Sequence, residues 1–428
     1  MSKQRKISVI GLGYVGLTVA AAFGKITPVL AFDTNATRIS ELKKGHDKNM
    51  EVDEQSLQTS NLYFTNDPSE LSKADFHIIA VPTPIDKNRC PDFRLLYEAS
   101  KLVGKHLKKG DIVIYKSSVY PGATEEKCVP LLEKSSRLIY GSDFTVGYSP
   151  ERINPADKAH FFQNIAKIVS GTDQATIDII CEVYKSVVKG GVFPVSSMRV
   201  AEAAKVIENT QRDINIALMN DIAIMLHHLN IDTAEVIKAM KTKWNYIPFQ
   251  PGLVGGHCIG VNSYYLLHKA EEAGYYSAII QAARKTNESL AKFLTEQTIK
   301  KLIHLEIPVK RARIAILGLT YKENCSDMRD TRVIDIIKEL HSYGVELIIH
   351  DPIADVAIAK KHYGIELQPW ENLTGLDAMI FTVAHQTYLK LDRNEIISKL
   401  NRPGLIMDIK EIFDFGEFSD PGILLWRL

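Results

Sequence analysis

The chain has 428 residues, and its 52 lysines and arginines nearly balance its 51 aspartates and glutamates, so the net charge is +1. This balance argues against a nucleic-acid-binding protein, which needs a basic surface to displace counterions from phosphate. With 45% hydrophobic and 24% charged residues, the composition excludes disorder, collagen and coiled coil as the main organisation. The length favours about three domains.

The five cysteines are scattered without Cys-x-x-Cys pairs, so neither a metal site nor a disulfide framework is indicated, and a cytoplasmic location is expected. Lys3, Arg5 and Lys6 precede an uncharged run over 7–24 that superficially resembles a secretory signal. Glycines interrupt that run and a strand-like segment follows it, so we interpret it as part of a folded domain. No other stretch is long and apolar enough to span a membrane, and no membrane partner is expected.

The first part of the chain alternates short apolar runs with helical stretches. This alternation predicts a parallel sheet covered by helices on both faces. We place this first doubly wound α/β domain at residues 1–195. Its strands are expected at 6–10, 28–32, 76–81, 111–115, 144–148 and 166–170.

The pattern then changes to long helices. Residues 199–229 contain no proline or glycine and carry apolar residues at helical spacing, which predicts a long helix that links domains and carries a subunit contact. A second helix is expected over 278–303, so a central helical domain spans 196–308. A second doubly wound domain follows at 309–428, with strands at 313–317, 346–350, 378–383 and 405–409. The predicted fold is two Rossmann-like α/β domains joined by a helical domain.

The clearest motif is Gly11-Leu-Gly13-Tyr14-Val15-Gly16, which follows a predicted strand and opens a helix. Gly11 permits a tight turn, Gly13 lets the backbone approach a pyrophosphate, and Gly16 allows close packing of helix on strand. A glycine-rich turn without a ligand is the alternative. Asp33 favours a bound dinucleotide, because it ends the next strand, where a carboxylate binds ribose hydroxyls. The same carboxylate repels a 2′-phosphate, so NAD is favoured over NADP. Arg38, a few residues further on, either stacks on adenine or is a solvated surface charge.

A second motif, 254–260, places Cys258 among glycines. Such a cysteine is a nucleophile if a neighbouring cation or helix terminus lowers its pKa, or else a buried structural residue, and the motif alone does not decide between them.

A third motif lies in the long helix. Lys205, Asn209 and Arg212 follow at spacings of four and three, so they share one face. Polar side chains on an otherwise apolar helix suggest contact with a polar substrate, and a solvated stripe is the alternative. Further polar clusters stand at strand ends, where α/β folds bind ligands, at 81–84, 116–124, 148–155 and 318–329.

These motifs together closely resemble the UDP-sugar 6-dehydrogenases, the family of UDP-glucose and UDP-N-acetylhexosamine dehydrogenases. The resemblance extends over nearly the whole chain and looks most like the bacterial enzymes that act on UDP-N-acetylglucosamine or UDP-N-acetylgalactosamine for capsule or O-antigen synthesis. The matching segments are GLGYVG at 11–16, VPTP at 81–84, VYPGATE at 119–125, GYSPERINP at 147–155, the helix at 201–221, GLVGGHCIG at 252–260 and GLTYKENCSDMR at 318–329.

The resemblance implies a four-electron oxidation of the sugar C6 alcohol to a carboxylate with two NAD. Cys258 would form a thiohemiacetal and then a thioester, Lys205 would stabilise alkoxide charge, and Asn209 would donate a hydrogen bond. Glu151 would act in acid/base steps or position the hydrolytic water. The resemblance also assigns Pro82, Thr83, Ser118, Thr124 and Arg329, the last across a dimer contact, to the cofactor, and Arg152, Arg212, Gly252 and Lys322 to the substrate.

One departure from the family pattern concerns the chemistry. The family usually has Asp-Pro four and five residues after the cysteine, whereas this chain has Asn262-Ser263. An amide cannot accept a proton at neutral pH, so a catalytically weakened NAD- and UDP-sugar-binding homologue is one alternative. A UDP-glucose 6-dehydrogenase is another, and a two-electron hydroxyacid-type dehydrogenase, which has no need of Cys258, is a third. A homodimer through the long helix, or a higher homo-oligomer, is expected.

Overall fold

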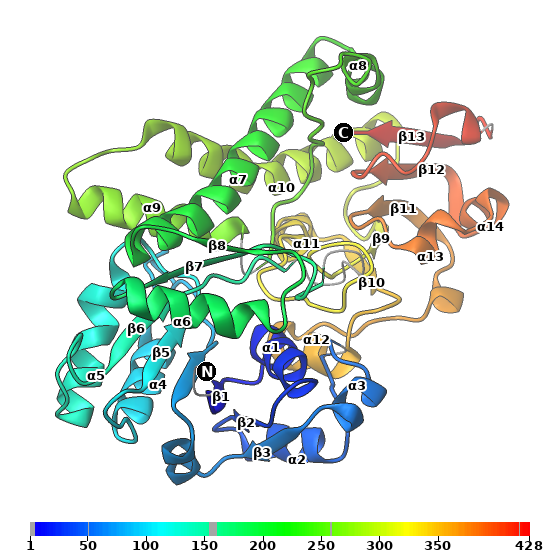
Figure 1. The fold of residues 1–428 in the computed structure, drawn as a ribbon. Helices are drawn as coiled ribbons and strands as arrows, with labels where there is room; N and C mark the ends of the chain where they lie inside the picture. Colours follow the sequence, from blue (N-terminus) through cyan, green and yellow to red (C-terminus); the bar gives the residue numbers. More distant parts are fainter. Residues whose placement is uncertain (1–4, 50, 154–160, 257–258, 419) are drawn as a thin grey trace. The chain divides into compact units, whose positions relative to one another are not determined.

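The computed structural model describes residues 5–49, 51–153, 161–256, 259–418 and 420–428. The chain divides into two compact units, Met1–Asn209 with Tyr264–Tyr276 and Thr210–Ser263 with Ser277–Leu428. Within the described residues, each unit contains one β-sheet with helices packed around it (Figure 1). The predicted α/β fold class is therefore confirmed, while the domain boundaries at 195 and 308 stay predictions.

The first unit holds the predicted doubly wound sheet. All six expected strands are present within two residues of their predicted bounds. The order β3-β2-β1-β4-β5 reverses direction between β1 and β4, which makes a topological switch point at the carboxyl ends of these two strands. Among the described residues the sheet has eight strands, in spatial order β3 (Leu62–Thr65), β2 (Val29–Phe32), β1 (Ile7–Ile10), β4 (Phe76–Ile79), β5 (Ile112–Tyr115), β6 (Thr145–Tyr148), β7 (Lys167–Gly171) and β8 (Val192–Pro194).

The sheet departs from parallel pairing at one position, among the later strands. Strand β7 pairs antiparallel with β6, with Gly147 opposite Gly171 and Tyr148 opposite Ser170. Parallel neighbours need a long crossover, usually a helix, and the sequence between residues 148 and 166 has no helical pattern. The sequence also gave no signal for β3 or β8, which are the two edge strands of this sheet.

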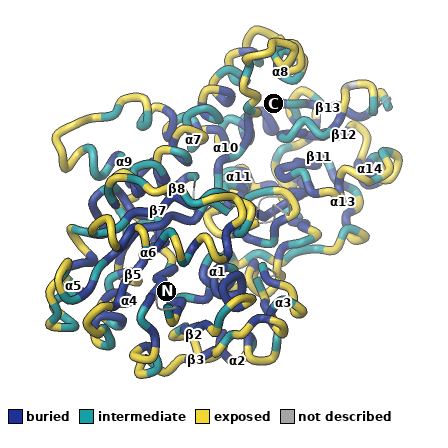
Figure 2. The backbone as a smooth tube through the Cα atoms, viewed as in Figure 1, coloured by how far each residue is buried: buried dark blue, intermediate teal, exposed yellow. Residues whose placement is uncertain are grey.

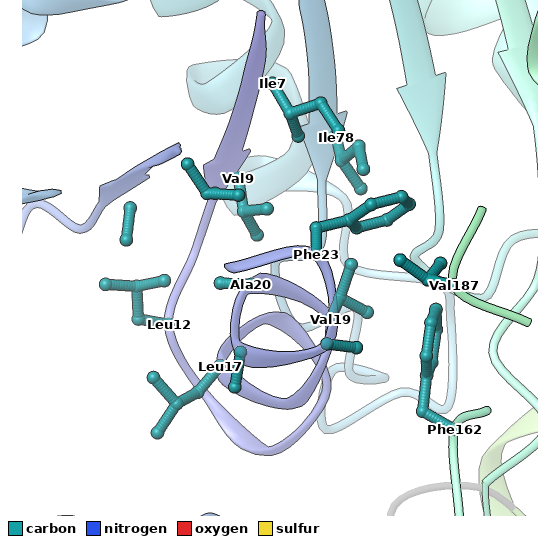
Figure 3. Close-up of a cluster of buried hydrophobic side chains, with 14 of the residues drawn as sticks. Ile7, Val9, Leu12, Leu17, Val19, Ala20, Phe23, Ile78, Phe162 and Val187 are labelled. Carbon is teal, nitrogen blue, oxygen red and sulfur yellow. The ribbon is translucent and has the colours of Figure 1, made fainter. Parts of the chain in front are cut away.

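Helix α1 (Tyr14–Gly24) lies at the centre of the hydrophobic core of the first unit. Its sequence is apolar on all sides, as expected of a buried helix. Leu17, Val19, Ala20 and Phe23 pack with Ile7 and Val9 of β1, Ile78 of β4, Phe162 and Val187 (Figure 3). The uncharged run over 7–24 is thus a buried strand and a buried helix. The other helices of the first sheet are α2 (Ala36–Lys43), α3 (Glu54–Thr59), α4 (Arg94–Gly104), α5 (Val129–Ser136) and α6 (Gln174–Lys185).

The long helix predicted over 199–229 is confirmed as α7 (Met198–His228), and the helix predicted over 278–303 is α10 (Ala278–His304). Between them lie α8 (Thr233–Met240) and α9 (Ile259–Glu272). No helix in the described parts of the chain has a stretch long and apolar enough to cross a membrane.

The sheet of the second unit is parallel throughout its described strands. Its order reverses between β9 and β11, which places a second switch point at their carboxyl ends. The central strands β9 and β11 are almost wholly buried, while the surrounding helices expose one side (Figure 2). In spatial order the strands are β10 (Glu346–His350), β9 (Arg313–Leu317), β11 (Leu376–Phe381), β12 (Leu400–Asp408) and β13 (Ile423–Arg427), and the helices are α11 (Val333–Ser342), α12 (Val356–Tyr363), α13 (Gln386–Leu389) and α14 (Arg393–Ser398).

Candidate active site

The glycine motif forms the turn between β1 and α1, next to the switch point of the first sheet. Gly11 has φ +91°, and a Cβ on it would lie 3.0 Å from the Ala80 carbonyl oxygen at the end of β4. A Cβ on Gly16 would lie 1.7 Å from the Gly11 oxygen, whereas a Cβ on Gly13 would meet nothing within 4 Å. Gly11 and Gly16 therefore shape the turn, and Gly13 leaves open space beside the first turn of α1, which begins with Tyr14 and Val15 and has no side-chain cap. This geometry fits a pyrophosphate at the helix N-terminus.

Asp33 and Arg38 both brace this turn. The Asp33 carboxylate accepts hydrogen bonds from the backbone N–H groups of Leu12 (2.8 Å) and Asn35 (2.9 Å). Arg38 is only 4% exposed, and its guanidinium donates to the Leu12 carbonyl (3.0 Å) and pairs with Asp47 (2.7 Å). The interpretation of Arg38 as a solvated surface charge is therefore wrong, and its contact with adenine stays a prediction.

The loops that follow β4 and β5 are tied to each other. The Thr83 hydroxyl donates to the Ser118 carbonyl oxygen (2.7 Å), and the Ser117 hydroxyl donates to the Val81 carbonyl oxygen (2.6 Å). Pro82 is exposed beside them. Three of the residues predicted to bind the cofactor thus belong to one surface at the carboxyl edge of the first sheet.

Glu202 of α7 holds the loop that carries Thr124. Its buried carboxylate accepts from the backbone N–H groups of Gly122 (2.5 Å) and Thr124 (2.9 Å), and Gly122 has φ +93°. Burial raises the pKa of Glu202 to about 7 in spite of these hydrogen bonds. The predicted cofactor residue Thr124 is therefore fixed to the helix that bears Lys205.

Lys205 and Asn209 are buried on α7, each 7% exposed, so the interpretation of this face as a solvated stripe is wrong for both. One helical turn separates them, as the sequence predicts. Arg212 is exposed, so the predicted interior row of three polar residues does not include it. A long arginine side chain reaches solvent more readily than an amide does.

Glu151 lies in a buried cluster with two lysines. Its carboxylate pairs with Lys167 of β7 (2.8 Å) and with Lys116 at the end of β5 (3.3 Å), and it accepts from the backbone N–H groups of Arg152 and Ile153. Burial opposes ionisation of Glu151, but the two ammonium charges outweigh it and lower its pKa to about 2. Burial lowers the pKa of Lys167 to about 8. A carboxylate with this pKa carries almost no proton near neutral pH.

Arg152, which lies next to Glu151 in the loop after β6, connects this loop to α7. Its guanidinium pairs with Glu208 (2.7 Å) and donates to the Ala166 carbonyl oxygen (3.2 Å). Its assignment to the substrate stays a prediction.

The second unit has a pocket at its own switch point, where the loops after β9, β11 and β12 meet. The predicted substrate residue Lys322 lines it, together with Thr320, Tyr321, Arg332, Thr382 and Lys410. Lys322 and Lys410 place two ammonium groups at this edge of the sheet, as suits a diphosphate, whereas Arg332 pairs with Asp335 (3.2 Å) and Glu323 also lines the pocket. Gly252 lies beside this pocket, because a Cβ on it would be 3.4 Å from the Lys410 ammonium group.

Two further predicted residues lie in the second unit. Arg329 is exposed and its guanidinium pairs with Asp327 through two oxygens (3.0 and 2.7 Å). Asn262 is fully buried in α9. Cys258 lies outside the described residues, and among the other cysteines Cys128 and Cys325 are buried while Cys90 is exposed.

Sequence reasoning missed Glu202, Lys167, and Arg332 and Lys410 of the second pocket, and it did not foresee that Lys116 of the cluster at 116–124 pairs with Glu151. Glu202 had a detectable signal, because it lies three residues before Lys205 on the same helical face. Lys410 follows directly after a strand end, which is a position where α/β folds bind ligands. The contacts of Lys116 and Lys167 depend on sheet register and have no local signal.

Three family models match in succession along the chain. The NAD binding domain of the UDP-glucose/GDP-mannose dehydrogenase family matches residues 5–188, the central domain matches 199–289, and the UDP binding domain matches 315–415. The glycine turn lies in the first of these matches and the Lys322 pocket largely in the third.

Curated and solved proteins agree with these matches. The chain is 50% identical to Protein CapL of Staphylococcus aureus, over 99% of this chain and 100% of that one. It is 47% identical to UDP-N-acetyl-D-glucosamine 6-dehydrogenase of Salmonella typhi, over 95% and 96% of the two chains. The structure of a UDP-D-ManNAc dehydrogenase from Pyrococcus horikoshii superposes with a TM-score of 0.88 at 28% identity, covering 99% of this chain and 98% of that one. The chain is therefore an NAD-dependent dehydrogenase that belongs to the UDP-glucose/GDP-mannose dehydrogenase family.

Proposed function

We propose that the protein oxidises the C6 hydroxyl of a UDP-N-acetylhexosamine to the uronic acid, with two NAD consumed per sugar. The observation that carries this proposal is the buried amine and amide pair, Lys205 and Asn209, on the helix that also fixes the cofactor loop through Glu202. Relatives that are 46–47% identical carry the name UDP-N-acetyl-D-glucosamine 6-dehydrogenase, which supports the sugar class.

NAD bound at the glycine turn would supply the hydride acceptor for both oxidation steps. The Lys205 ammonium group and the Asn209 amide would stabilise negative charge on the C6 oxygen. Cys258 would add to the aldehyde as a thiolate, so that the aldehyde stays on the enzyme until the thioester is hydrolysed. Because Glu151 is ionised, its role would be to position the hydrolytic water through accepted hydrogen bonds rather than to donate a proton.

A weakened enzyme is the second candidate, and Asn262 favours it. This residue is buried where the resembled family usually has an aspartate, and an amide cannot take up a proton. The variant Asn262→Asp separates the two candidates. A large gain in kcat on restoring the carboxylate would support a weakened enzyme, and an unchanged or reduced kcat would support a fully active one.

The hexosamine itself is tested by a substrate panel. UDP-N-acetylglucosamine, UDP-N-acetylgalactosamine and UDP-glucose are compared by NADH absorbance, with products identified by mass. We expect the highest kcat/KM with one of the two N-acetylhexosamines. A preference for UDP-glucose, or tight binding without turnover of any of the three, would overturn the proposal.

We also propose a cytoplasmic homodimer that supplies capsule or O-antigen synthesis. The odd number of cysteines, scattered along the sequence, suits a reducing compartment. Val200, Ile207, Leu218 and Met225 of α7 are exposed apolar side chains, which supports self-association through this helix. The similarity to CapL supports the capsule assignment. Sedimentation of the purified protein at two concentrations tests the oligomeric state.

A further inference from the structure

The segment 252–263, which carries Cys258, is held at its first residue by α7. The backbone N–H of Gly252 donates to Oδ1 of Asn220 (2.7 Å), and Nδ2 of Asn220 donates to the Gly252 carbonyl oxygen (3.1 Å). Gly252 has φ +151°, a conformation that residues with a Cβ rarely adopt. One side chain therefore satisfies both backbone groups of this glycine.

The residues just before His257 are held by the loop after β9. The backbone N–H of Gly256 donates to the Asp330 carbonyl oxygen (3.2 Å), and Gly256 has φ +83°. A Cβ on Gly255 would lie 2.8 Å from the Asp330 oxygen, and a Cβ on Gly256 would lie 2.7 Å from the Tyr321 ring. Both glycines are therefore required by close packing against this loop.

The last residue of the segment is held by α7 again. The Ser263 hydroxyl donates to Oδ2 of Asp213 (2.6 Å). The other oxygen of Asp213 accepts from the Arg284 guanidinium (2.7 Å) and from Nδ2 of Asn287 (2.7 Å), both on α10. Both oxygens of Asp213 are thus occupied and its side chain is completely buried, so it suits a positioning role rather than that of a base.

The two ends of the segment belong to one network. Oδ1 of Asn287 accepts from Nδ2 of Asn220 (2.8 Å), which connects the Gly252 anchor to the Asp213 anchor. All five side chains of the network are at most 2% exposed. A buried network that satisfies its members is rigid, and removing one member leaves the others with unmet hydrogen bonds.

We propose that Asp213, Asn220 and Ser263 are positioning residues that fix the chain on either side of Cys258, at Gly252 and at Ser263, for the reaction proposed for that cysteine. This inference rests on the proposed role of Cys258 as the nucleophile. The hydrogen bond from Ser263 to Asp213 distinguishes this chain from the usual family pattern. The family usually has a proline at this position, and a proline has no hydroxyl group that could donate to Asp213. Ser263, the fifth residue of α9 and five residues beyond the cysteine, fixes the first part of this helix to α7.

The test compares Ser263→Ala and Asn220→Ala with the matched control Thr295→Val. Thr295 is also a fully buried hydroxyl residue of the second unit, but its hydroxyl donates to the Ala291 carbonyl oxygen of its own helix. For each full-length protein, kcat and KM are measured, together with the rate of alkylation of Cys258 by iodoacetamide. The exposed Cys90 serves as the internal reference for alkylation.

We expect Ser263→Ala to lower kcat about 10-fold or more and to leave both KM values within about twofold, because Ser263 orients a reacting group without binding the substrate. The Cys258 alkylation rate, relative to Cys90, should change by a similar factor, and the control should match the wild type in both readouts. Asn220→Ala, which changes the Gly252 end of the segment, should also lower kcat, leave KM unchanged and alter the Cys258 alkylation rate. If the Asn220→Ala protein does not fold, the result for Ser263→Ala alone decides whether the inference holds.

The variant Cys258→Ala separates the two possible failures. If Cys258→Ala is inactive while Ser263→Ala behaves like the control, the positioning inference is wrong and the proposed function stands. If Cys258→Ala still releases two NADH per sugar, the proposed function itself is wrong.

Discussion

The Glu151 carboxylate shows how single residues set the charge of the candidate site. Lys116 and Lys167 are both buried, and their ammonium groups keep this carboxylate ionised well below its ordinary pKa of 4.5. Because the folded-state pKa is about 2, the unfolded chain binds more protons than the folded one between pH 2 and 4.5. The stabilisation from Glu151 is complete above pH 4.5 and is lost as the pH falls toward 2.

At this residue scale we predict a large cost for Glu151→Gln. The change leaves two buried ammonium groups without their counter-charge, which should lower the free energy of unfolding by about 3 to 5 kcal/mol. Urea unfolding at pH 7 measures this. Glu208→Gln is the control, because its ion pair with Arg152 is partly exposed and should be worth less than about 1 kcal/mol. Equal costs for the two variants would contradict the buried cluster.

At the scale of elements, the β1–α1 turn separates a folding requirement from a binding requirement. Gly16→Ala should destabilise the protein by several kcal/mol, about 3 or more, because its Cβ would meet the Gly11 carbonyl. Gly13→Ala should change the free energy of unfolding by less than about 1 kcal/mol, since its Cβ enters open space, and should weaken NAD binding about 10-fold or more by occupying the pyrophosphate position. Titration calorimetry and urea unfolding together measure both effects. Unchanged NAD affinity in Gly13→Ala would place the cofactor elsewhere.

The contact between α7 and the Thr124 loop gives a second prediction at this scale. Burial raises the pKa of Glu202 from 4.5 to about 7, so between these values the folded protein binds more protons than the unfolded one. This group's contribution to stability is therefore complete below pH 4.5 and declines as the pH rises through 7, by at most about 1.4 kcal/mol per pH unit. Glu202→Gln should flatten this decline in unfolding measurements at pH 5, 6, 7 and 8. A variant whose pH dependence equals that of the wild type would show that Glu202 does not titrate in this range.

Over the whole molecule, the alternation of strands and helices is visible in the sequence wherever strands are central. The strands it fails to predict, β3, β8 and β13, are all at sheet edges, where fewer side chains are buried and the apolar pattern is weaker. The glycine turn, Asp33, Lys205 and Asn209 are predictable because local spacing places them. The contact of Lys116 and Lys167 with Glu151 is not, because it joins residues 35 and 16 positions apart through the register of neighbouring strands.

The Asp213 network is hidden from the sequence for the same reason. It unites three helices and a loop, and apart from Asp213 and Asn220 on α7 and Arg284 and Asn287 on α10 its members are far apart in sequence. Tertiary packing alone brings Ser263 to Asp213. The sequence shows that Asn262 and Ser263 replace the usual Asp-Pro, but it does not show that the Ser263 hydroxyl donates to Asp213.

The central claim is a four-electron oxidation through Cys258, and the most direct test is the number of NADH formed per UDP-N-acetylhexosamine consumed. The wild-type protein should form two NADH and one uronic acid per sugar, with no free aldehyde trapped by a hydrazine reagent. Cys258→Ala should form no uronic acid. One NADH per sugar with release of an aldehyde, or an unchanged double oxidation in Cys258→Ala, would contradict the claim.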